Sequence, residues 1–279
     1  MDRLITRLVK KGQPLSHIHA EHKEELPVSL RSLYNYIDGG VLTIKNLDLR
    51  RKTSYRPRKK PTVKKPGFQN QEYRKGRTYD DFQTFLQKYP STPIVEMDTV
   101  KGVRESGKRM LTMIFRENSV MLLFLMPDGT AESVVNVFDF LTDTLGLEAF
   151  QRLFPVLLTD NGSEFKRVKE IERACTEERR TRVFFCDPQA SWQKPHIEKN
   201  HEFIRYVIPR GKSFTPYTED DITLLMNHIN SVKRRSLSHR SPYDLVLQGD
   251  EDMEWLMTIL GMHTIPPDDV HLKADLFKK

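Results

Sequence analysis

The sequence lacks the features of a secreted, disulfide-bonded or membrane-spanning protein. It has two cysteines in 279 residues, Cys175 and Cys186, too few for a disulfide framework or a cysteine-based zinc site. No apolar run approaches the length needed to cross a bilayer. The first residues, MDRLITRLVKKG, contain no apolar segment of the kind that a signal peptide needs. These absences favour a soluble protein of the reducing cytoplasm with no membrane partner.

Positive charge is concentrated in one band of the chain. The net charge is +7, but residues 50–77 alone hold twelve lysines and arginines and one glutamate. Such a band attracts a polyanion, most often nucleic acid, although a solvated linker without a partner is the alternative. Pro57, Pro61 and Pro66 disfavour compact structure within it. We therefore predict a basic linker over residues 48–79.

Two short helices are predicted before the linker, over about 16–25 and about 30–37. Ser16 and Ser29 are candidate N-caps, and Pro27 separates the helices. One face of the second helix is apolar, whereas four polar or aromatic side chains lie off that face: Arg31, Ser32, Tyr34 and Asn35. Two helices around a tight turn, the second presenting polar residues, form the helix-turn-helix pattern that binds the major groove. The sequence thus predicts a small all-α DNA-binding segment over 1–47.

After the linker the pattern changes to strands and then to alternating helices and strands. The expected elements are a helix at 80–89, strands at 94–100, 108–116 and 120–126, a helix from Thr130 to about 144, a strand at 156–159, a charged helix at about 166–180, a strand at 182–185, and helices that begin near Glu198, Thr218 and Glu251. Three hairpin-connected strands followed by helix–strand alternation indicate a mixed α/β domain.

Three carboxylates lie at the ends of these core elements. Asp98 lies in the first strand, Asp160 directly follows the strand at 156–159, and Glu198 falls in the first turn of a helix. Phosphodiester chemistry needs an activated oxygen nucleophile and a stabilised leaving oxygen, which two magnesium ions about 4 Å apart can supply. Magnesium prefers a few hard oxygen ligands together with water. We interpret these three residues as ligands of divalent metal for phosphodiester chemistry on DNA.

Each of these carboxylates has a simpler interpretation. A strand-end aspartate is more often a turn residue than a ligand, and Asp160-Asn161-Gly162 is itself a good turn sequence. Glu198 also fits a solvated helix face. Three further acidic residues compete for the same role: Glu96, Glu164 and Asp187.

Three segments resemble the signature regions of DDE transposases and retroviral-type integrases, and in particular the insertion-sequence-thirty family of bacterial transposases. They are IVEMDTVKG, LLTDNGSEF and DPQASWQKPHIEKNHEFIRYVIPRGKSF, and the later NSVKRRSLSHRSPYDLV resembles the closing segment of that family. The resemblance covers about residues 80–248. The chain departs from the family at Pro195, where a small residue is common, and at its front, which is shorter than usual and suggests a truncated reading frame.

The resemblance implies an RNase H-like fold, with a mixed five-stranded sheet flanked by helices. It implies cleavage at the ends of an insertion element and transfer of the freed 3′-hydroxyl into target DNA. Asp98, Asp160 and Glu198 would be both the catalytic residues and the ligands of Mg²⁺, with Mn²⁺ as a substitute. The implied partners are the terminal inverted repeats, target DNA and further copies of the chain on paired ends, at the bacterial nucleoid.

DNA contacts are predicted from three parts of the chain: Arg31, Ser32, Tyr34, Asn35, Arg56, Arg58, Lys59, Lys60, Trp192, Lys194, Lys199 and Arg205. Trp192 is expected to stack on a base or sugar, with packing in the core as the alternative. A solvated face is the alternative for Lys194, Lys199 and Arg205. His196 and His201 are expected at the surface or facing DNA, not as metal ligands.

The chain is thus divided into a helix-turn-helix segment (1–47), a basic linker (48–79), a catalytic core (80–248) and a C-terminal helical tail (249–279). Two functions compete with a transposase. One is a truncated transposase that binds DNA and regulates without cutting, and the other is a general nuclease on the same scaffold.

Overall fold

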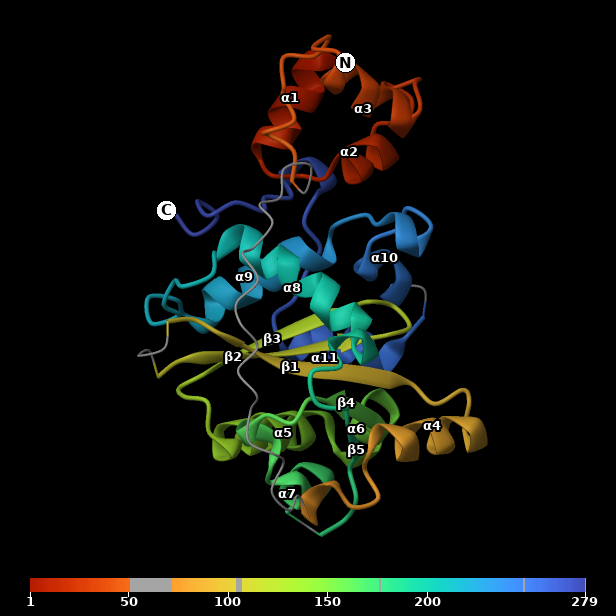
Figure 1. Ribbon diagram of the computed structural model, residues 1–279, viewed down its shortest axis with the longest axis vertical. Coiled ribbons are helices and arrows are strands. Elements are labelled where there is room, and N and C mark those ends of the chain that lie inside the picture. Colours follow the sequence, from red (N-terminus) through yellow and green to blue (C-terminus); the bar gives the residue numbers. More distant parts are fainter. Residues whose placement is uncertain (51–71, 104–106, 176, 248, 279) are drawn as a thin grey trace.

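A five-stranded mixed sheet forms the centre of the computed structural model, which describes residues 1–50, 72–103, 107–175, 177–247 and 249–278 (Figure 1). The elements in chain order are α1 (Asp2–Lys10), α2 (Leu15–Glu21), α3 (Leu30–Asp38), α4 (Tyr79–Lys88), β1 (Ile94–Lys101), β2 (Arg109–Phe115), β3 (Met121–Met126), α5 (Ala131–Leu145), α6 (Leu147–Leu153), β4 (Val156–Thr159), α7 (Val168–Glu172), β5 (Arg182–Phe185), α8 (Pro195–Val207), α9 (Glu219–Asn230), α10 (Pro242–Val246) and α11 (Glu251–Ile259). Within the described ranges, every helix is too short or too polar to cross a membrane.

The strand order confirms the fold class predicted from the sequence. The order is β3-β2-β1-β4-β5, with β1, β2 and β3 antiparallel and β4 and β5 parallel to β1. A hairpin meander followed by two parallel strands through helical crossovers is the RNase H-like arrangement. Helices α8 and α9 lie on one side of the sheet and α5 and α7 on the other (Figure 1).

Alternation along the strands divides the sheet into two faces. Val95 and Met97 of β1 belong to the main apolar core, which also contains α5 residues such as Phe138. Glu96 and Asp98 alternate with them and therefore lie on the opposite face. The four methionines that the sequence assigned to packing are buried, at positions 110, 113, 121 and 126. The sheet thus leaves acidic residues only on the face that α8 covers.

Both edges of the sheet are occupied by groups from neighbouring segments. At β5, the amide of Val183 donates to the Glu172 carboxylate at 3.1 Å, and the amide of Phe185 donates to the Arg77 carbonyl at 2.8 Å. At β3, the Asn230 side chain bonds both backbone groups of Met121 at 2.9 Å. These contacts satisfy strand amides that would otherwise be free to pair with another chain.

The N-terminal helices form a separate small core. Side chains of α1, α2 and α3, such as Ile5, Ile18 and Leu33, pack together in it. Ser29 caps α3, as predicted, because its hydroxyl accepts from the Ser32 amide at 3.0 Å. Three expectations were wrong: α1 was not foreseen, α2 starts after Pro14 and not at a Ser16 cap, and residues 22–29 form a longer connection than a tight turn.

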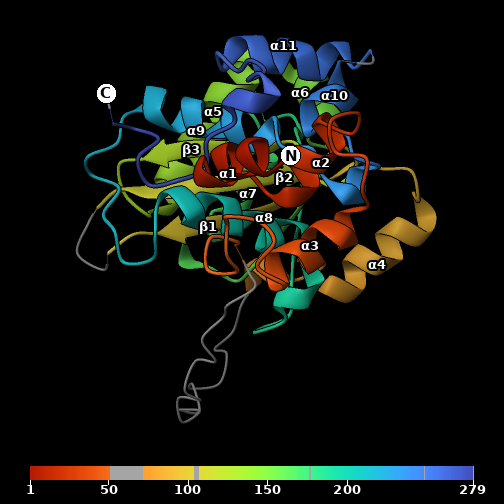
Figure 2. The ribbon, with the colours of Figure 1, turned by 90° about the horizontal axis from the view of Figure 1, so that it is seen from above.

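This N-terminal unit is docked on the core through the C-terminal segment. The amide of Leu272 donates to the Lys11 carbonyl at 2.9 Å. His17 accepts from the Lys233 amide at 2.9 Å, and His22 contacts Asp268 at 2.7 Å. Figure 2 shows the three helices over the side of the sheet that carries α8. The segment after α11 therefore ties the first helices to the domain built around the sheet.

The charged stretch after β4 is not the single helix expected over 166–180. A short 3-10 turn is followed by α7, which ends at Glu172, and the chain then turns back. The reason is Arg180, which is buried and donates to the carbonyls of Glu170 at 2.7 Å and Ile171 at 2.9 Å. If the helix continued, those carbonyls would accept hydrogen bonds from backbone amides of the next turn. The Arg180 guanidinium donates to them instead, and the helix ends at Glu172.

We expect acid to destabilise the fold through His228. This buried imidazole accepts from the His271 amide at 3.0 Å, and burial, with His271 and His263, lowers its pKa from 6.5 to about 4. Because the unfolded chain binds the proton more readily below pH 6.5, stability is lost as the pH falls from there towards 4 and is kept above it. The loss from this one group at pH 5 is about 2 kcal/mol.

The measurement is the free energy of unfolding in urea at several pH values for wild type and His228→Gln. The variant should show a flatter dependence between pH 7 and 5. The control is His239→Asn, because His239 is exposed and asparagine tolerates its left-handed backbone. Equal slopes in wild type and His228→Gln would contradict the assignment.

Candidate active site

The register of β1 and β4 places two aspartates side by side. The last paired residues of these parallel strands are Glu96 and Leu158. Asp98 and Asp160 each follow that pair by two residues, so the alternation of side chains puts both on the same face. The carboxyl ends of parallel strands meet at one edge of the sheet. Two carboxylates distant in sequence are thereby brought to the same place by backbone geometry alone.

A tight turn fixes the direction of Asp160. Its Oδ1 accepts from the Gly162 amide at 3.0 Å, and the Asn161 side chain donates to the Cys186 carbonyl at 2.8 Å. A Cβ atom at Gly162 would lie 2.7 Å from Oε2 of Glu164 and 3.1 Å from Oδ1 of Asp160. A larger residue at this position would therefore have to displace the Glu164 carboxylate.

The third carboxylate comes from the first turn of α8. The helix starts at Pro195, whose fixed φ and missing N–H suit the first helical position. Lys194 is the N-cap residue, and Glu198 follows it by four positions, about one turn. Pro195, where the chain departs from the family pattern, is therefore the first residue of the helix, and Glu198 remains in the first turn.

Glu96 anchors the start of α8 to β1. Its Oε2 accepts from the Ile197 amide at 2.8 Å, and its Oε1 accepts from Arg116 at 2.8 Å and from His196 at 3.0 Å. Burial raises the pKa of Glu96, but the bonds from His196 and Ile197 and the charge of Arg116 outweigh it, so that the pKa is lowered overall. The charged Glu96 side chain therefore holds the first turn of α8, which carries Glu198, against β1.

His201 ties the next turn of α8 to the sheet. Its Nε2 lies 2.8 Å from the hydroxyl of Thr112, which donates to the Asp98 carbonyl at 3.0 Å. Burial, with Lys194 and Arg205, lowers the pKa of His201 to about 4, so the ring is neutral at pH 7. Because the Thr112 proton is already used, His201 donates to that hydroxyl. Its side chain is half-buried and bonded to the sheet, so it is not freely exposed at the surface.

The carboxylates act electrostatically on one another. Burial raises the pKa of Asp160, the charge of Lys194 lowers it, and the charge of Asp98 raises it; the net effect is a raised pKa. Burial and the charge of Asp98 likewise raise the pKa of Glu198, which is more exposed. Repelling carboxylates of this kind favour a bound cation. The sheet and α8 have therefore assembled an anionic centre from three separate segments.

A lysine ammonium already lies at this centre. Lys194 is 2% exposed, and its Nζ is 3.0 Å from Oδ2 of Asp98 and 3.1 Å from the Met97 carbonyl. Burial lowers the pKa of Lys194, but Asp98 and Asp160 together raise it above 10.5. The burial of Lys194 and its pairing with Asp98 contradict the solvated face that was the alternative prediction, whereas its predicted DNA contact stays a prediction.

The donor chemistry of the centre fits a hard divalent cation, since all three candidate ligands are carboxylates. As arranged, however, no three His, Cys, Asp or Glu side chains converge on one point within the described residues. The Lys194 ammonium bonds to Asp98, which is one of the three carboxylates. The carboxylate ligands thus suit magnesium. In this structure, however, the cation beside them is the Lys194 ammonium.

The structure gives the competing acidic residues other contacts. Glu96 holds α8, as described above. Asp187 is bonded twice to the Gln193 side chain, at 2.7 Å and 2.8 Å. Glu164 is buried and accepts from Thr99 and Ser163, and its charge raises the pKa of Asp160. Glu164 therefore belongs to the surroundings of Asp160, whereas Asp187 does not.

The residues predicted to contact DNA lie in different surroundings. Arg31, Tyr34 and Asn35 are exposed on α3, and Ser32 is half-buried and bonded to Ser29. Trp192 is 74% exposed, so it is not part of the core. Lys199 is exposed on α8, and Arg205 is half-buried and donates to the Lys101 carbonyl at 3.0 Å. Arg56, Arg58, Lys59 and Lys60 lie outside the described residues.

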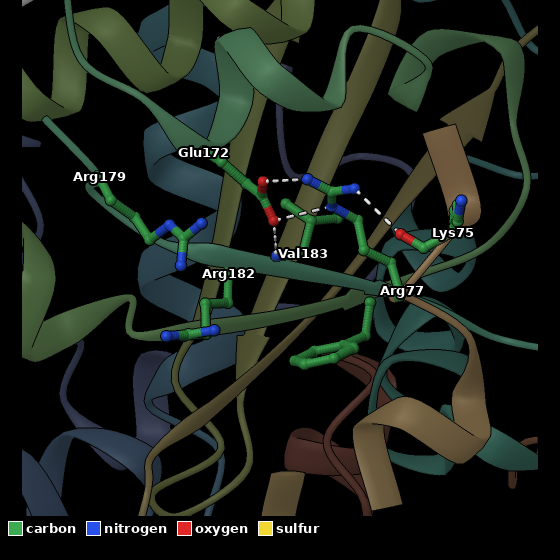
Figure 3. Close-up of a pocket in the computed structure, with 8 residues that line it drawn as sticks. Lys75, Arg77, Glu172, Arg179, Arg182 and Val183 are labelled. Carbon is green, nitrogen blue, oxygen red and sulfur yellow. Dashed lines mark hydrogen bonds and ion pairs between the residues drawn. The ribbon is translucent and has the colours of Figure 1, made fainter. Parts of the chain in front are cut away.

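A basic notch beside β5 was not foreseen from the sequence. It has a volume of about 200 Å³ and is lined by Lys75, Gly76, Arg77, Glu172, Arg179, Arg182, Val183 and Phe184. The one acidic residue, Glu172, is bonded to Arg77 at 2.6 Å and 3.0 Å (Figure 3). Arg179 and Arg182 are exposed at its mouth. No local pattern indicates this notch, because three separate segments form it.

The sheet order, with carboxylates after β4, on β1 and in the first turn of α8, defines the class as an RNase H-like core. Among solved structures, the chain is similar to the catalytic core of BIV integrase, with 16% identity, a TM-score of 0.40, and 58% of this chain and 97% of that chain covered. It is also similar to a simian T-cell lymphotropic virus intasome in complex with a PP2A regulatory subunit, with 13% identity, a TM-score of 0.42, and 55% and 53% covered.

The curated relatives include several transposases. The chain is 28% identical over 153 residues to the transposase of insertion sequence element IS1086 from Cupriavidus metallidurans, covering 55% of this chain and 42% of that one. It is 27% identical over 154 residues to that of IS30C from Escherichia coli, covering 55% and 38%. A probable transposase of IS1161 from Streptococcus salivarius is 25% identical over 226 residues, covering 79% and 59%.

These relatives confirm the predicted resemblance to insertion-sequence transposases of the IS30 type. The matched part spans about two fifths of the length of the first two relatives. No protein-family model matches the chain.

We expect Glu96→Gln to lower the free energy of unfolding by roughly 3 kcal/mol, since it leaves the buried Arg116 interaction without its charge partner and weakens the anchor of α8. Urea unfolding followed by circular dichroism measures the change. The control is Glu117→Gln, which removes an exposed carboxylate on the hairpin after β2. Equal destabilisation by the two variants would show that Glu96 is not an anchor.

Proposed function

We propose that this chain carries the catalytic core of a DNA transposase that cuts at the ends of an insertion element and joins the freed 3′-hydroxyl to target DNA. The observation that carries the proposal is the β1–β4 register, which places Asp98 beside Asp160 under the first turn of α8. The transposase relatives support it. A site formed of carboxylates alone suits phosphodiester chemistry, because it supplies the hard oxygen ligands that divalent ions need.

Asp98, Asp160 and Glu198 would hold the divalent ion, Mg²⁺ or Mn²⁺. When bound, such an ion activates a water or hydroxyl oxygen and stabilises the leaving oxygen. The remaining residues position these ligands. Gly162 holds the Asp160 carboxylate, Thr112 holds the Asp98 backbone, and Glu96 holds the helix that presents Glu198.

DNA would contact the protein at two kinds of surface. The exposed side chains of α3 have the polarity to bond base edges in a major groove. The basic notch beside β5, together with Lys199 and Arg205 on α8, would bind phosphates without regard to sequence. Trp192, exposed just before α8, would stack on an unpaired base near the cut. The partners would be terminal inverted repeats, target DNA and further copies of the chain on paired ends, in the cytoplasm at the nucleoid.

Three substitutions test the catalytic centre: Asp98→Asn, Asp160→Asn and Glu198→Gln. Each should lower cleavage and joining by about a thousandfold or more, because each removes a proposed ligand that acts together with the others. The assay uses the DNA that flanks the gene as ends, a supercoiled plasmid as target, and Mg²⁺. DNA binding should remain, and Glu117→Gln should retain activity.

The products distinguish the alternatives. Joined product from Asp160→Asn would refute the assigned site. Specific binding by wild type without nicking would favour the non-catalytic DNA-binding protein. Cutting without joining would favour the general nuclease.

The two DNA surfaces should differ in how binding responds to salt. Asn35→Ala should weaken binding to the element ends about tenfold and leave non-specific binding unchanged, because a base contact carries sequence information. Arg182→Ala should weaken binding to both and reduce the slope of log K against log salt by about one. Titrations at several salt concentrations measure both effects, with Lys88→Ala as the control. If the salt slope of Arg182→Ala equals that of wild type, the notch does not bind DNA.

A further inference from the structure

Lys194 gives the carboxylate centre a cation of its own. Its ammonium is buried with 2% exposure and bonded to Oδ2 of Asp98 at 3.0 Å and to the Met97 carbonyl at 3.1 Å. The charges of Asp160 and Glu198 also act on it. A buried ammonium is costly unless it is paired, so these carboxylates are what keep the Lys194 side chain inside.

The same oxygen cannot serve both cations at once. A divalent ion coordinates carboxylate oxygen at about 2.1 Å, which would place it well within repulsive range of an ammonium on the same Oδ2. Lys194 has a flexible stem of four carbons and starts from the N-cap of α8, so its side chain can leave while the helix stays in place.

We propose that Lys194 is a tethered counter-ion that competes with the divalent metal for Asp98, Asp160 and Glu198. It offsets one of the three negative charges before the metal enters, and it withdraws from Asp98 when the metal binds. The consequence is a metal affinity lower than three carboxylates alone would give. This inference rests on the proposed metal site and goes beyond it, because it assigns Lys194 a role that opposes metal binding.

The first test measures Mn²⁺ binding to the full chain without DNA, with free Mn²⁺ followed by electron paramagnetic resonance. Lys194→Met, which keeps the length of the side chain and removes its charge, should bind Mn²⁺ roughly 10- to 100-fold more tightly than wild type. The matched control is Lys199→Met, because Lys199 is an exposed lysine on the same helix. It should change the affinity by less than about threefold, as expected for a solvent-screened charge.

Three outcomes separate this inference from the proposed function. Tighter binding in Lys194→Met only, abolished by adding Asp98→Asn, supports it. Binding that needs Asp98 but is equal in wild type and Lys194→Met overturns the competition and leaves the metal site standing. If neither wild type nor Lys194→Met binds Mn²⁺, both the competition and the proposed metal site are overturned.

A second test uses wild type alone and does not depend on the folding of a variant. Reductive methylation followed by mass spectrometry measures how fast each lysine reacts. Lys194 should be protected relative to Lys199 in EDTA and should react at least about fivefold faster in saturating Mn²⁺, because it is displaced to solvent. Protection unchanged by bound Mn²⁺ would overturn the proposal.

Discussion

Mutual repulsion among carboxylates is the constraint on which the rest of the α8 side of the sheet depends. The parallel register of β1 and β4 forces Asp98 and Asp160 together, and α8 adds Glu198, so the fold concentrates negative charge where burial makes it costly. The surrounding residues respond to that charge. Lys194 supplies a cation, Gly162 supplies an amide, and Glu96 keeps the start of α8 in contact with the sheet. Removing any of these supports would act on the geometry of all three acids.

Local chemistry made much of the fold predictable. Runs of apolar residues located all five strands, and side-chain caps at Ser29, Thr130 and Thr218 marked helix starts that the structure confirms. The expectations that failed in the core depend on distant partners. Arg180 shortens the helix after β4 by bonding the carbonyls of α7, and no pattern within 166–180 reveals that. The candidate acids were identifiable as strand-end and helix-start residues. The burial of Lys194 was not, because it requires the packing of α8 against β1.

The edges of the sheet restrict how copies of the chain can associate. The outward amides of β5 are bonded to Glu172 and to the Arg77 carbonyl, and Met121 on β3 is bonded to Asn230. These bonds occupy backbone groups at both edges of the sheet, which disfavours its extension by a second copy at those positions. A multimer on paired DNA ends would therefore form more readily through helices and loops than through these strand groups. Such contacts would leave the register of β1 and β4, and with it the spacing of Asp98 and Asp160, unaffected by assembly.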